Sequence, residues 1–277
     1  MAWLDRILTK PKPSSDPVPE VEPISPLLSY QVANLQQKGA RPYQEDSFAF
    51  VNALDVTEIR ENGLMAIVAD GMGGMEAGKQ VSEMAVSCMV SAFSQMQRTG
   101  DLALQLRNAV IAADDALVQR FKGIGGTTLI SCIIYDEKLY FASVGDSYLY
   151  LMRGGSLYRL NREQNYRHQL YTEAISAGSI DPTEADQDPD GHRLSAFLGM
   201  GGLSDLDYLR QPLPLRDGDI LLLCSDGVGG VVTESQIIQN LSSSSAAEMC
   251  LNLDESVRRA ARLHQDNYTA LVIRCEL

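Results

Sequence analysis

Four aspartates stand beside glycine or another short polar residue, next to apolar runs. An aspartate at a strand end holds its carboxylate at the rim of a sheet on a rigid support, and a neighbouring glycine lets a backbone carbonyl approach closely. Mg²⁺ and Mn²⁺ prefer oxygen ligands and keep several waters, so a few carboxylates and one carbonyl suffice to bind them. One Asp-Gly pair alone is typical of a turn, whereas the repeated pattern favours a metal site. The four are Asp70 in Ala-Asp-Gly, Asp146 in Gly-Asp-Ser, Asp226 in Ser-Asp-Gly and Asp266 in Gln-Asp-Asn.

A guanidinium precedes two further carboxylates near the start of the patterned sequence. Arg41 is followed by Glu45 and Asp46. A guanidinium can hold a phosphate through two hydrogen bonds, and carboxylates can orient waters bound to a metal. Taken alone, the segment is equally consistent with a surface salt bridge. Phosphate binding therefore requires that Arg41 meet the aspartates in the folded protein.

Apolar periodicity predicts the elements that position these residues. Helices are expected over residues 81–96, 102–121 and 246–263, with a weak helical pattern at 166–174. Strands are expected over 64–69, 128–135, 138–143, 148–153, 219–224 and 268–275. The three strands between 128 and 153 are interpreted as an antiparallel meander, and residues 161–211 as loops beside the sheet. Grouped helices and strands favour a layered α+β fold over a regular parallel one.

Composition and charge exclude several classes of function. The 277 residues are 45% hydrophobic and 21% charged, as in a folded globular protein. A formal net charge of −13 argues against nucleic acid as a partner. The five cysteines are odd in number and contain no Cys-x-x-Cys pair, so they are interpreted as reduced thiols. With neither a signal peptide nor a transmembrane segment in the pattern, we expect a cytoplasmic protein.

The first 27 residues differ in character from the rest of the chain. Residues 10–26 contain six of the eleven prolines and are interpreted as a linker. Apolar residues at nearly helical spacing in residues 1–9 are consistent with a short anchor for a membrane surface or a partner, or with a frayed terminus. We expect one domain over residues 28–277.

Six motifs occur in a fixed order along that domain. Together they resemble the motif set of bacterial PP2C-type (PPM) metal-dependent protein serine/threonine phosphatases, and the resemblance extends from about residue 30 to residue 277. It implies a four-layer α-β-β-α sandwich of two mainly antiparallel sheets flanked by helix pairs. The motifs are Arg41-x-x-x-Glu45-Asp46, Val-Ala-Asp-Gly-Met-Gly-Gly at 68–74, Gly-Gly-Thr-Thr-Leu at 125–129, Val-Gly-Asp-Ser at 144–147, Leu-Leu-Leu-Cys-Ser-Asp-Gly at 221–227 and Asp-Asn-x-Thr-Ala at 266–270.

The resemblance also implies a role for each motif residue. Arg41, Asp70, Asp226 and Asp266 would be catalytic, with Arg41 binding the substrate phosphate. Asp70 would bridge two metal ions, the Gly71 carbonyl would bind one of them, and Asp226 and Asp266 would complete the shell of the other. Asp146 would help to hold a third, weaker ion, and Glu45 and Asp46 would act through metal-bound waters. Gly126, Thr127 and Thr128 would be structural.

The implied reaction is hydrolysis of phosphoserine and phosphothreonine in proteins by a hydroxide that bridges two Mg²⁺ or Mn²⁺ ions. The partner would be a phosphorylated protein, and the enzyme would oppose a serine/threonine kinase. Residues 166–202 would cover the site and set substrate choice. The histidines His168, His192 and His264 match no role in the family pattern and are interpreted as solvated or structural.

The chain departs from the family pattern at several positions. Met72 and Met75 stand where many members carry a histidine able to protonate the leaving group. Tyr148 replaces the usual arginine after Gly-Asp-Ser, and Leu160–Gln164 reads Leu-Asn-Arg-Glu-Gln instead of Leu-Thr-x-Asp-His. These departures keep open the alternative of a non-catalytic or weakly active regulatory protein that binds a phosphoprotein. A nucleotide-binding loop at residues 71–74 is disfavoured, because Gly78-Lys79 is followed by glutamine and no Gly-x-Gly-x-x-Gly spacing occurs.

Overall fold

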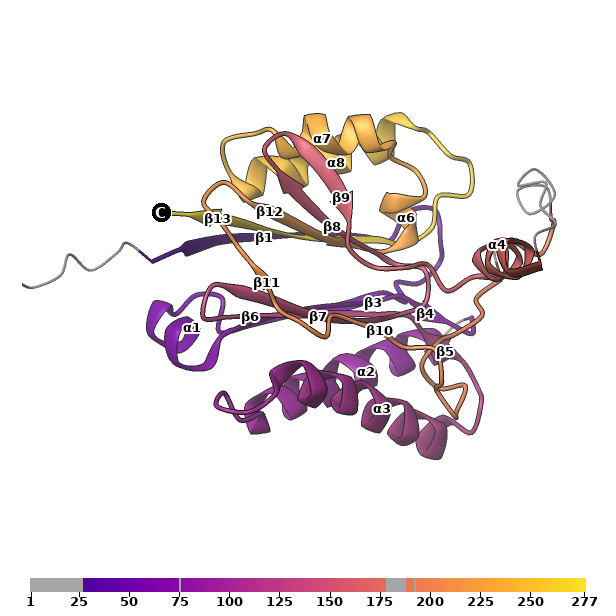
Figure 1. The fold of residues 1–277 in the computed structure, drawn as a ribbon. Helices are drawn as coiled ribbons and strands as arrows, with labels where there is room; N and C mark the ends of the chain where they lie inside the picture. The colour runs from indigo at the N-terminus through magenta and orange to yellow at the C-terminus, as the bar shows by residue number, and fades with distance from the viewer. Residues whose placement is uncertain (1–26, 75, 178–187, 192) are drawn as a thin grey trace, which may run out of the picture.

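Apolar runs form the central strands of two antiparallel sheets that pack face to face (Figure 1). The computed structural model describes residues 27–74, 76–177, 188–191 and 193–277. The predicted α+β class with antiparallel sheets is confirmed. The predicted linker and the apolar segment at residues 1–9 lie outside the described residues.

The first sheet contains the strands that lead to Asp226 and away from Asp266. Its order is β1-β13-β12-β8-β9, and every neighbouring pair is antiparallel. The strands are β1 (Ser29–Gln37), β8 (Tyr148–Arg153), β9 (Ser156–Arg159), β12 (Ile220–Cys224) and β13 (Tyr268–Glu276).

The second sheet contains the strand that leads to Asp70. Its order is β10-β7-β6-β3-β2, with β11 also paired to β7. A separate two-stranded pair joins the chain just after Asp70 to the turn before β6. The strands are β2 (Ser47–Val51), β3 (Leu64–Ala69), β6 (Leu129–Tyr135), β7 (Lys138–Val144), β10 (Asp207–Tyr208) and β11 (Leu213–Pro214), and the separate pair is β4 (Gly71–Met72) with β5 (Gly126–Thr127).

Helices cover the outer face of each sheet (Figure 1). The second sheet is covered by α2 (Glu76–Gln95) and α3 (Leu102–Phe121), and the first by α7 (Glu234–Leu241) and α8 (Ala246–Arg259). The shorter helices are α1 (Val56–Asn62), α4 (Tyr166–Ala177) and α6 (Asp226–Gly229). No helix within the described ranges combines the length and hydrophobicity of a membrane span.

Strand β3 shows how the sequence specifies this layering. All six of its residues are buried. Because successive side chains on a strand point to opposite faces, Leu64, Ala66 and Val68 enter the core between the sheets, whereas Met65 and Ile67 pack toward α2 and α3. A strand that is buried on both faces consists of a continuous run of apolar residues. The bounds of β3 could therefore be predicted correctly from the apolar run alone.

The predicted meander over residues 128–153 is wrong. Strands β6 and β7 form a hairpin, but β8 pairs with β12 in the opposite sheet. The chain crosses between the sheets through Gly145, Asp146 and Ser147. Gly145 has φ of +101°, a conformation that favours glycine and turns the chain out of the hairpin plane.

Two further predictions need correction. Residues 161–211 are not loops alone, because α4 occupies Tyr166–Ala177 and β10 adds to the edge of the second sheet. The last helix ends at Arg259 rather than at residue 263, and Ala261, just beyond it, has a positive φ of +47°. All five cysteines lie among the described residues and are free, as the sequence predicts.

Candidate metal centre

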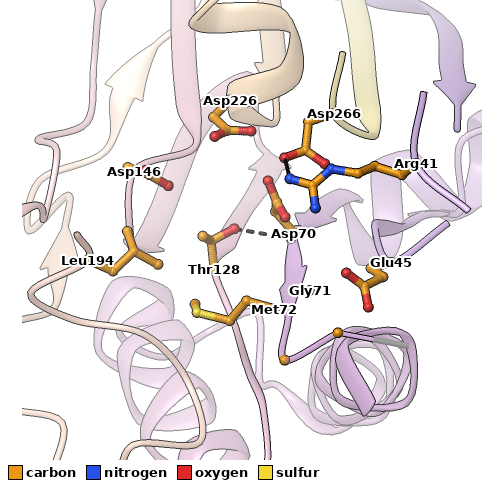
Figure 2. A pocket seen from close by; sticks show the side chains of 12 residues that line it. Arg41, Glu45, Asp70, Gly71, Met72, Thr128, Asp146, Leu194, Asp226 and Asp266 are labelled. Carbon is orange, nitrogen blue, oxygen red and sulfur yellow. Dashed lines mark hydrogen bonds and ion pairs between the residues drawn. The ribbon is translucent and has the colours of Figure 1, made fainter. Parts of the chain in front are cut away.

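A pocket of about 300 Å³ opens at the end of the sandwich where β3 and β12 finish (Figure 2). Both sheets contribute to it, since Asp70 follows β3, Asp226 begins the short helix after β12, and Asp266 precedes β13. The lining residues are Arg41, Glu45, Asp70, Gly71, Met72, Gly73, Gly74, Thr128, Asp146, Leu194, Asp226 and Asp266. The structure thus brings every candidate site residue except Asp46 to the wall of one pocket.

Burial and mutual repulsion change the acidity of the aspartates in this pocket. Burial raises the pKa of Asp70 well above its usual range, and the charges of Asp46, Asp226, Asp146 and Asp266 raise it further. Burial, with the charge of Asp226, also raises the pKa of Asp146 to about 7. Such carboxylates repel one another unless protons or a cation intervene.

Unpartnered oxygens indicate that a group with positive charge fits here. Asp226 Oδ1, Glu45 Oε1 and Asp46 Oδ1 are buried without a hydrogen-bond partner among the described residues. A buried acceptor that lacks a partner is costly, and native structures usually satisfy it with water or an ion. Hard divalent cations take carboxylate oxygens of this kind. The residues present therefore fit a Mg²⁺ or Mn²⁺ centre.

The carboxylates surround a space rather than a single point. Among the described residues, no group of three His, Cys, Asp or Glu side chains is drawn together tightly enough to form one ion's ligand cluster. Figure 2 shows Asp226 and Asp266 next to each other with Asp70 below them, and Asp146 farther to one side. Mg²⁺ is commonly held by only one or two carboxylates and several waters. The arrangement therefore suits ions that share carboxylates and keep part of their water.

Arg41 reaches this pocket from the loop after β1. Its Nη2 donates to Asp266 Oδ2 at 2.5 Å, and its side chain is 53% exposed. The segment is therefore no distant surface salt bridge, because the arginine lies at the rim of the aspartate cluster (Figure 2). A half-exposed guanidinium at this place can meet an incoming anion without crossing the protein interior.

Glu45 and Asp46 occupy different places. Glu45 lines the pocket, whereas Asp46 lies behind it and is almost fully buried. Asp46 Oδ2 accepts hydrogen bonds from Ser225 Oγ at 2.9 Å and Thr269 Oγ1 at 2.7 Å. Burial nevertheless raises the pKa of Asp46 to about 6. Asp46 thus joins the ends of β12 and β13 immediately behind the aspartates.

Gly71 is required by the close approach of three chain segments. A Cβ there would lie 2.3 Å from the Gly78 carbonyl oxygen and 2.6 Å from that of Glu45. Both neighbours are backbone atoms and cannot move aside cheaply. The sequence argument that glycine beside an aspartate permits close backbone approach therefore holds at this position.

Thr128 links two of the predicted ligand segments. Its Oγ1 accepts a hydrogen bond from the Asp70 amide at 3.1 Å and lies 2.8 Å from Ser147 Oγ. The end of β3 is thereby tied to the loop that carries Asp146. Thr128 also lines the pocket, so the structural role implied by the resemblance would be exercised at the pocket wall itself.

Asn267, which was not among the predicted site residues, clamps the loop that carries Arg41. Asn267 Nδ2 donates to the Lys38 and Tyr43 carbonyls at 2.7 and 2.9 Å. Its Oδ1 accepts from the Glu45 amide at 2.7 Å. The available signal was the asparagine that follows Asp266 directly in a quoted motif, because a buried amide side chain can satisfy several backbone groups at once.

The segment predicted to cover the site contributes one described residue to the pocket lining. That residue is Leu194, while α4 lies to the side of the site (Figure 1). Residues 178–187 and His192 lie outside the described residues. His168 and His264 do not line the pocket.

Comparisons with known sequences agree with this geometry. A family profile described as Protein phosphatase 2C matches residues 44–265. The serine/threonine phosphatase stp of Listeria monocytogenes is 30% identical over 232 residues, which cover 80% of this chain and 88% of that protein. The protein phosphatase PhpP of Streptococcus pneumoniae is 32% identical over 189 residues, covering 64% of this chain and 72% of that protein.

Solved structures share the same architecture. The serine/threonine phosphatase PstP/Ppp of Mycobacterium tuberculosis superposes with a TM-score of 0.73 at 27% identity, covering 91% of this chain and all of that one. The catalytic domain of PstP in complex with two manganese ions superposes with a TM-score of 0.71 at 26% identity and the same coverage. The predicted resemblance is therefore confirmed.

Proposed function

Since the chain belongs to the protein phosphatase 2C family, we propose that residues 28–277 hydrolyse phosphoserine and phosphothreonine in proteins with the help of two divalent cations. The enzyme class predicted from the sequence, a protein serine/threonine phosphatase, is confirmed by the named relatives. One observation carries the mechanistic part of the proposal. Asp70, Asp226 and Asp266 come from two different sheets and meet in one pocket beside Arg41.

Within this proposal the aspartates hold the cations. Asp70 lines the pocket together with the other two and would be a ligand of both ions. The Gly71 carbonyl would be a further ligand of one ion, and Asp226 and Asp266 would be ligands of the other. When bound, Mg²⁺ or Mn²⁺ would lower the pKa of a water ligand, so that hydroxide is available at neutral pH, and would neutralise charge on the phosphate. The manganese-bound structure of a relative supports metal dependence. Asp146, with its carboxylate to one side, would hold a third and weaker ion.

The chain's own side chains would bind and orient the substrate. Arg41 would donate two hydrogen bonds to the phosphate, exchanging its contact with Asp266 for the substrate dianion. Glu45, which lines the pocket, and Asp46, whose Oδ1 is buried behind it without a partner among the described residues, would act through waters bound to the cations. Met72 lines the pocket where a histidine acid is common in the family, so water would protonate the leaving alkoxide.

The proposal extends to the cellular setting. Its substrate would be a phosphorylated protein, and its action would oppose a serine/threonine kinase in the cytoplasm. Five free cysteines among the described residues support a reducing compartment.

The test is hydrolysis of a phosphothreonine peptide by the purified protein. We expect turnover with Mn²⁺ and loss of turnover in EDTA. Asp226→Asn should lower kcat by more than the roughly 10- to 100-fold typical of losing a residue that only orients a ligand. Asp115→Asn, on the exposed face of α3, is the matched control and should act like the wild type.

Two results would contradict the proposal. Unchanged turnover in Asp226→Asn would exclude the metal mechanism. Tight peptide binding without turnover, measured with the wild type and Mn²⁺, would instead support the regulatory alternative. Calorimetric titration of Mn²⁺ into the same samples would show whether the centre is intact in each case.

A further inference from the structure

Two departures from the family pattern meet beside the pocket. Tyr148 replaces an arginine, and the altered segment Leu160–Gln164 follows Arg159 at the end of β9. We propose that Arg159 is a positioning residue: through Tyr148 it holds the loop that carries Asp146 against the helix that begins at Asp226. This inference rests on the proposed function, because it concerns two of the proposed metal ligands.

The loop of Gly145, Asp146 and Ser147 is first held by the altered segment itself. Gln164 Oε1 accepts a hydrogen bond from the backbone N–H of Gly145 at 2.7 Å. The backbone N–H of Gln164 donates in turn to the Gly145 carbonyl at 3.0 Å. Asn161 Nδ2 donates to the Ser147 carbonyl at 2.9 Å. Both side chains are buried. The altered residues therefore bind the backbone on each side of Asp146, so the segment is an ordered support and not a degenerate loop.

Tyr148 connects this loop to the helix of Asp226. Its ring packs against Gly229, the last residue of α6. A Cβ added at Gly229 would lie 2.3 Å from a carbon of the Tyr148 ring. The ring also contacts Arg159, whose guanidinium carbon lies 4.0 Å from the ring centroid, and it stacks on Tyr150 with the ring centroids 5.8 Å apart. A ring bounded by a guanidinium and by glycine backbone has little freedom to move.

Arg159 is itself fixed by its surroundings. It forms an ion pair with Glu163, four residues along the chain, and both side chains are about one quarter exposed. Its Nη2 lies 3.5 Å from the Ser147 carbonyl oxygen, a contact too long to be a strong hydrogen bond. Its Nε is buried without a hydrogen-bond partner among the described residues. The guanidinium is therefore held over the ring even though one donor stays unsatisfied, as expected if stacking on Tyr148 fixes its place.

A purely electrostatic role makes a different prediction from a positioning role. Through charge alone, removing Arg159 would leave the pocket more negative and tighten Mn²⁺ binding, whereas neutralising Glu163 would weaken it. If Arg159 instead acts by positioning, loss of Arg159 removes the guanidinium from the Tyr148 ring, and loss of the Glu163 charge leaves that guanidinium unanchored. The ring is freed in both cases. Both changes would then weaken Mn²⁺ binding.

The experiment compares Arg159→Met, Arg159→Lys and Glu163→Gln with the wild type. Mn²⁺ affinity and stoichiometry are measured by calorimetry, and kcat and KM with a phosphothreonine peptide, at a temperature where urea titration shows each variant to be folded. We expect Arg159→Met and Glu163→Gln each to weaken the weakest Mn²⁺ site and lower kcat by about 10-fold, with peptide KM changed less than about 2-fold. Arg159→Lys keeps a cation over the ring and should stay within about 3-fold of the wild type.

The control is Arg259→Met, which breaks an exposed pair with Glu255 at the same four-residue separation on α8. It should leave Mn²⁺ binding and kcat unchanged. Opposite shifts of Mn²⁺ affinity in Arg159→Met and Glu163→Gln would overturn the positioning role, and so would wild-type values in both. A wild type that neither binds Mn²⁺ nor hydrolyses the peptide would overturn the proposed function instead, so the two failures are distinguishable.

Discussion

Arg41 contacts Asp266 at the pocket rim, so one side chain faces both a proposed metal ligand and the space for the substrate. A guanidinium binds a phosphate in a planar two-point geometry that an ammonium cannot reproduce. We therefore predict that Arg41→Lys raises KM for a phosphothreonine peptide roughly 10-fold while kcat at saturating Mn²⁺ changes less. Steady-state kinetics with the purified variant measure both constants.

The matched control for this prediction is Arg258→Lys. Arg258 forms an ion pair with Asp254 on the exposed side of α8 and does not line the pocket. It should leave both constants as in the wild type. If Arg41→Lys lowered kcat and left KM unchanged, Arg41 would act on the metal ligands rather than on the bound phosphate.

At the scale of elements, the loop between β1 and β2 depends on one side chain from the other end of the sequence. Asn267 satisfies three backbone groups of residues 38–45, and that loop carries Arg41 and Glu45. Removing the amide leaves these groups to water and lowers the free energy of local opening. We predict that Asn267→Ala speeds amide hydrogen exchange across residues 38–45 by about 10-fold or more, with unchanged protection in β3.

Asn252→Ala is the matched control for the loop. Asn252 Nδ2 donates to Ser243 Oγ in the turn between α7 and α8, far along the chain from the loop. Exchange of residues 38–45 should be as slow in this variant as in the wild type. Equal exchange rates in Asn267→Ala and the wild type would show that the loop is held by other contacts.

Helices and strands could be predicted where their own apolar residues, without any distant partner, specify them. The bounds of β3, β8 and α3 agree with the sequence pattern, because each is specified by its own apolar residues. The strand that pairs with β8 could not be predicted. An apolar strand after a glycine turn has the same sequence pattern whether it pairs with the preceding strand or joins the other sheet. Helix α7 was missed although it begins with a capping box of Thr233 and Gln236, a local signal that was present in the sequence.

The site was predictable in part only. Asp-Gly spacing suggested separate carboxylates at strand ends, but their convergence came from a family resemblance and not from the local pattern. Asp70 and Asp226 follow strands of different sheets, so no local rule brings them together. The support of Asp146 by Asn161 and Gln164 was invisible for the same reason, since it depends on the crossing between the sheets.

At the scale of the whole molecule, the packing between the sheets places the metal centre. Leu64 and Val68 of one sheet meet Leu221, Leu223 and Leu271 of the other in a shared core. The strands that lead to Asp70 and Asp226 are therefore fixed relative to each other by apolar burial. That burial forces carboxylates together at one end of a protein whose formal net charge is already −13. The folded state must offset this repulsion with protons or cations.

The last prediction concerns the pH dependence of the metal-free protein. Burial raises the pKa of Asp46 to about 6 and of Asp146 to about 7, above the 3.8 of an unperturbed aspartate. The folded state then binds protons more tightly than the unfolded state, so these groups contribute most to stability below pH 3.8 and their contribution is lost as pH rises through 6 and 7. Each unit of pKa shift corresponds to about 1.4 kcal/mol.

We therefore expect the free energy of unfolding in EDTA, measured by urea titration, to fall by roughly 5 kcal/mol between pH 4.5 and pH 7.5. Mn²⁺ binds the deprotonated carboxylates, so its stabilising effect should be larger at pH 7.5 than at pH 5 and should remove most of this decline. The same titration in Ca²⁺-free buffer with saturating Mn²⁺ is the comparison. Stability that rises with pH in EDTA would contradict the raised pKa values of the buried aspartates. A Mn²⁺ effect that is equal at both pH values would mean that the ion does not replace protons on these carboxylates.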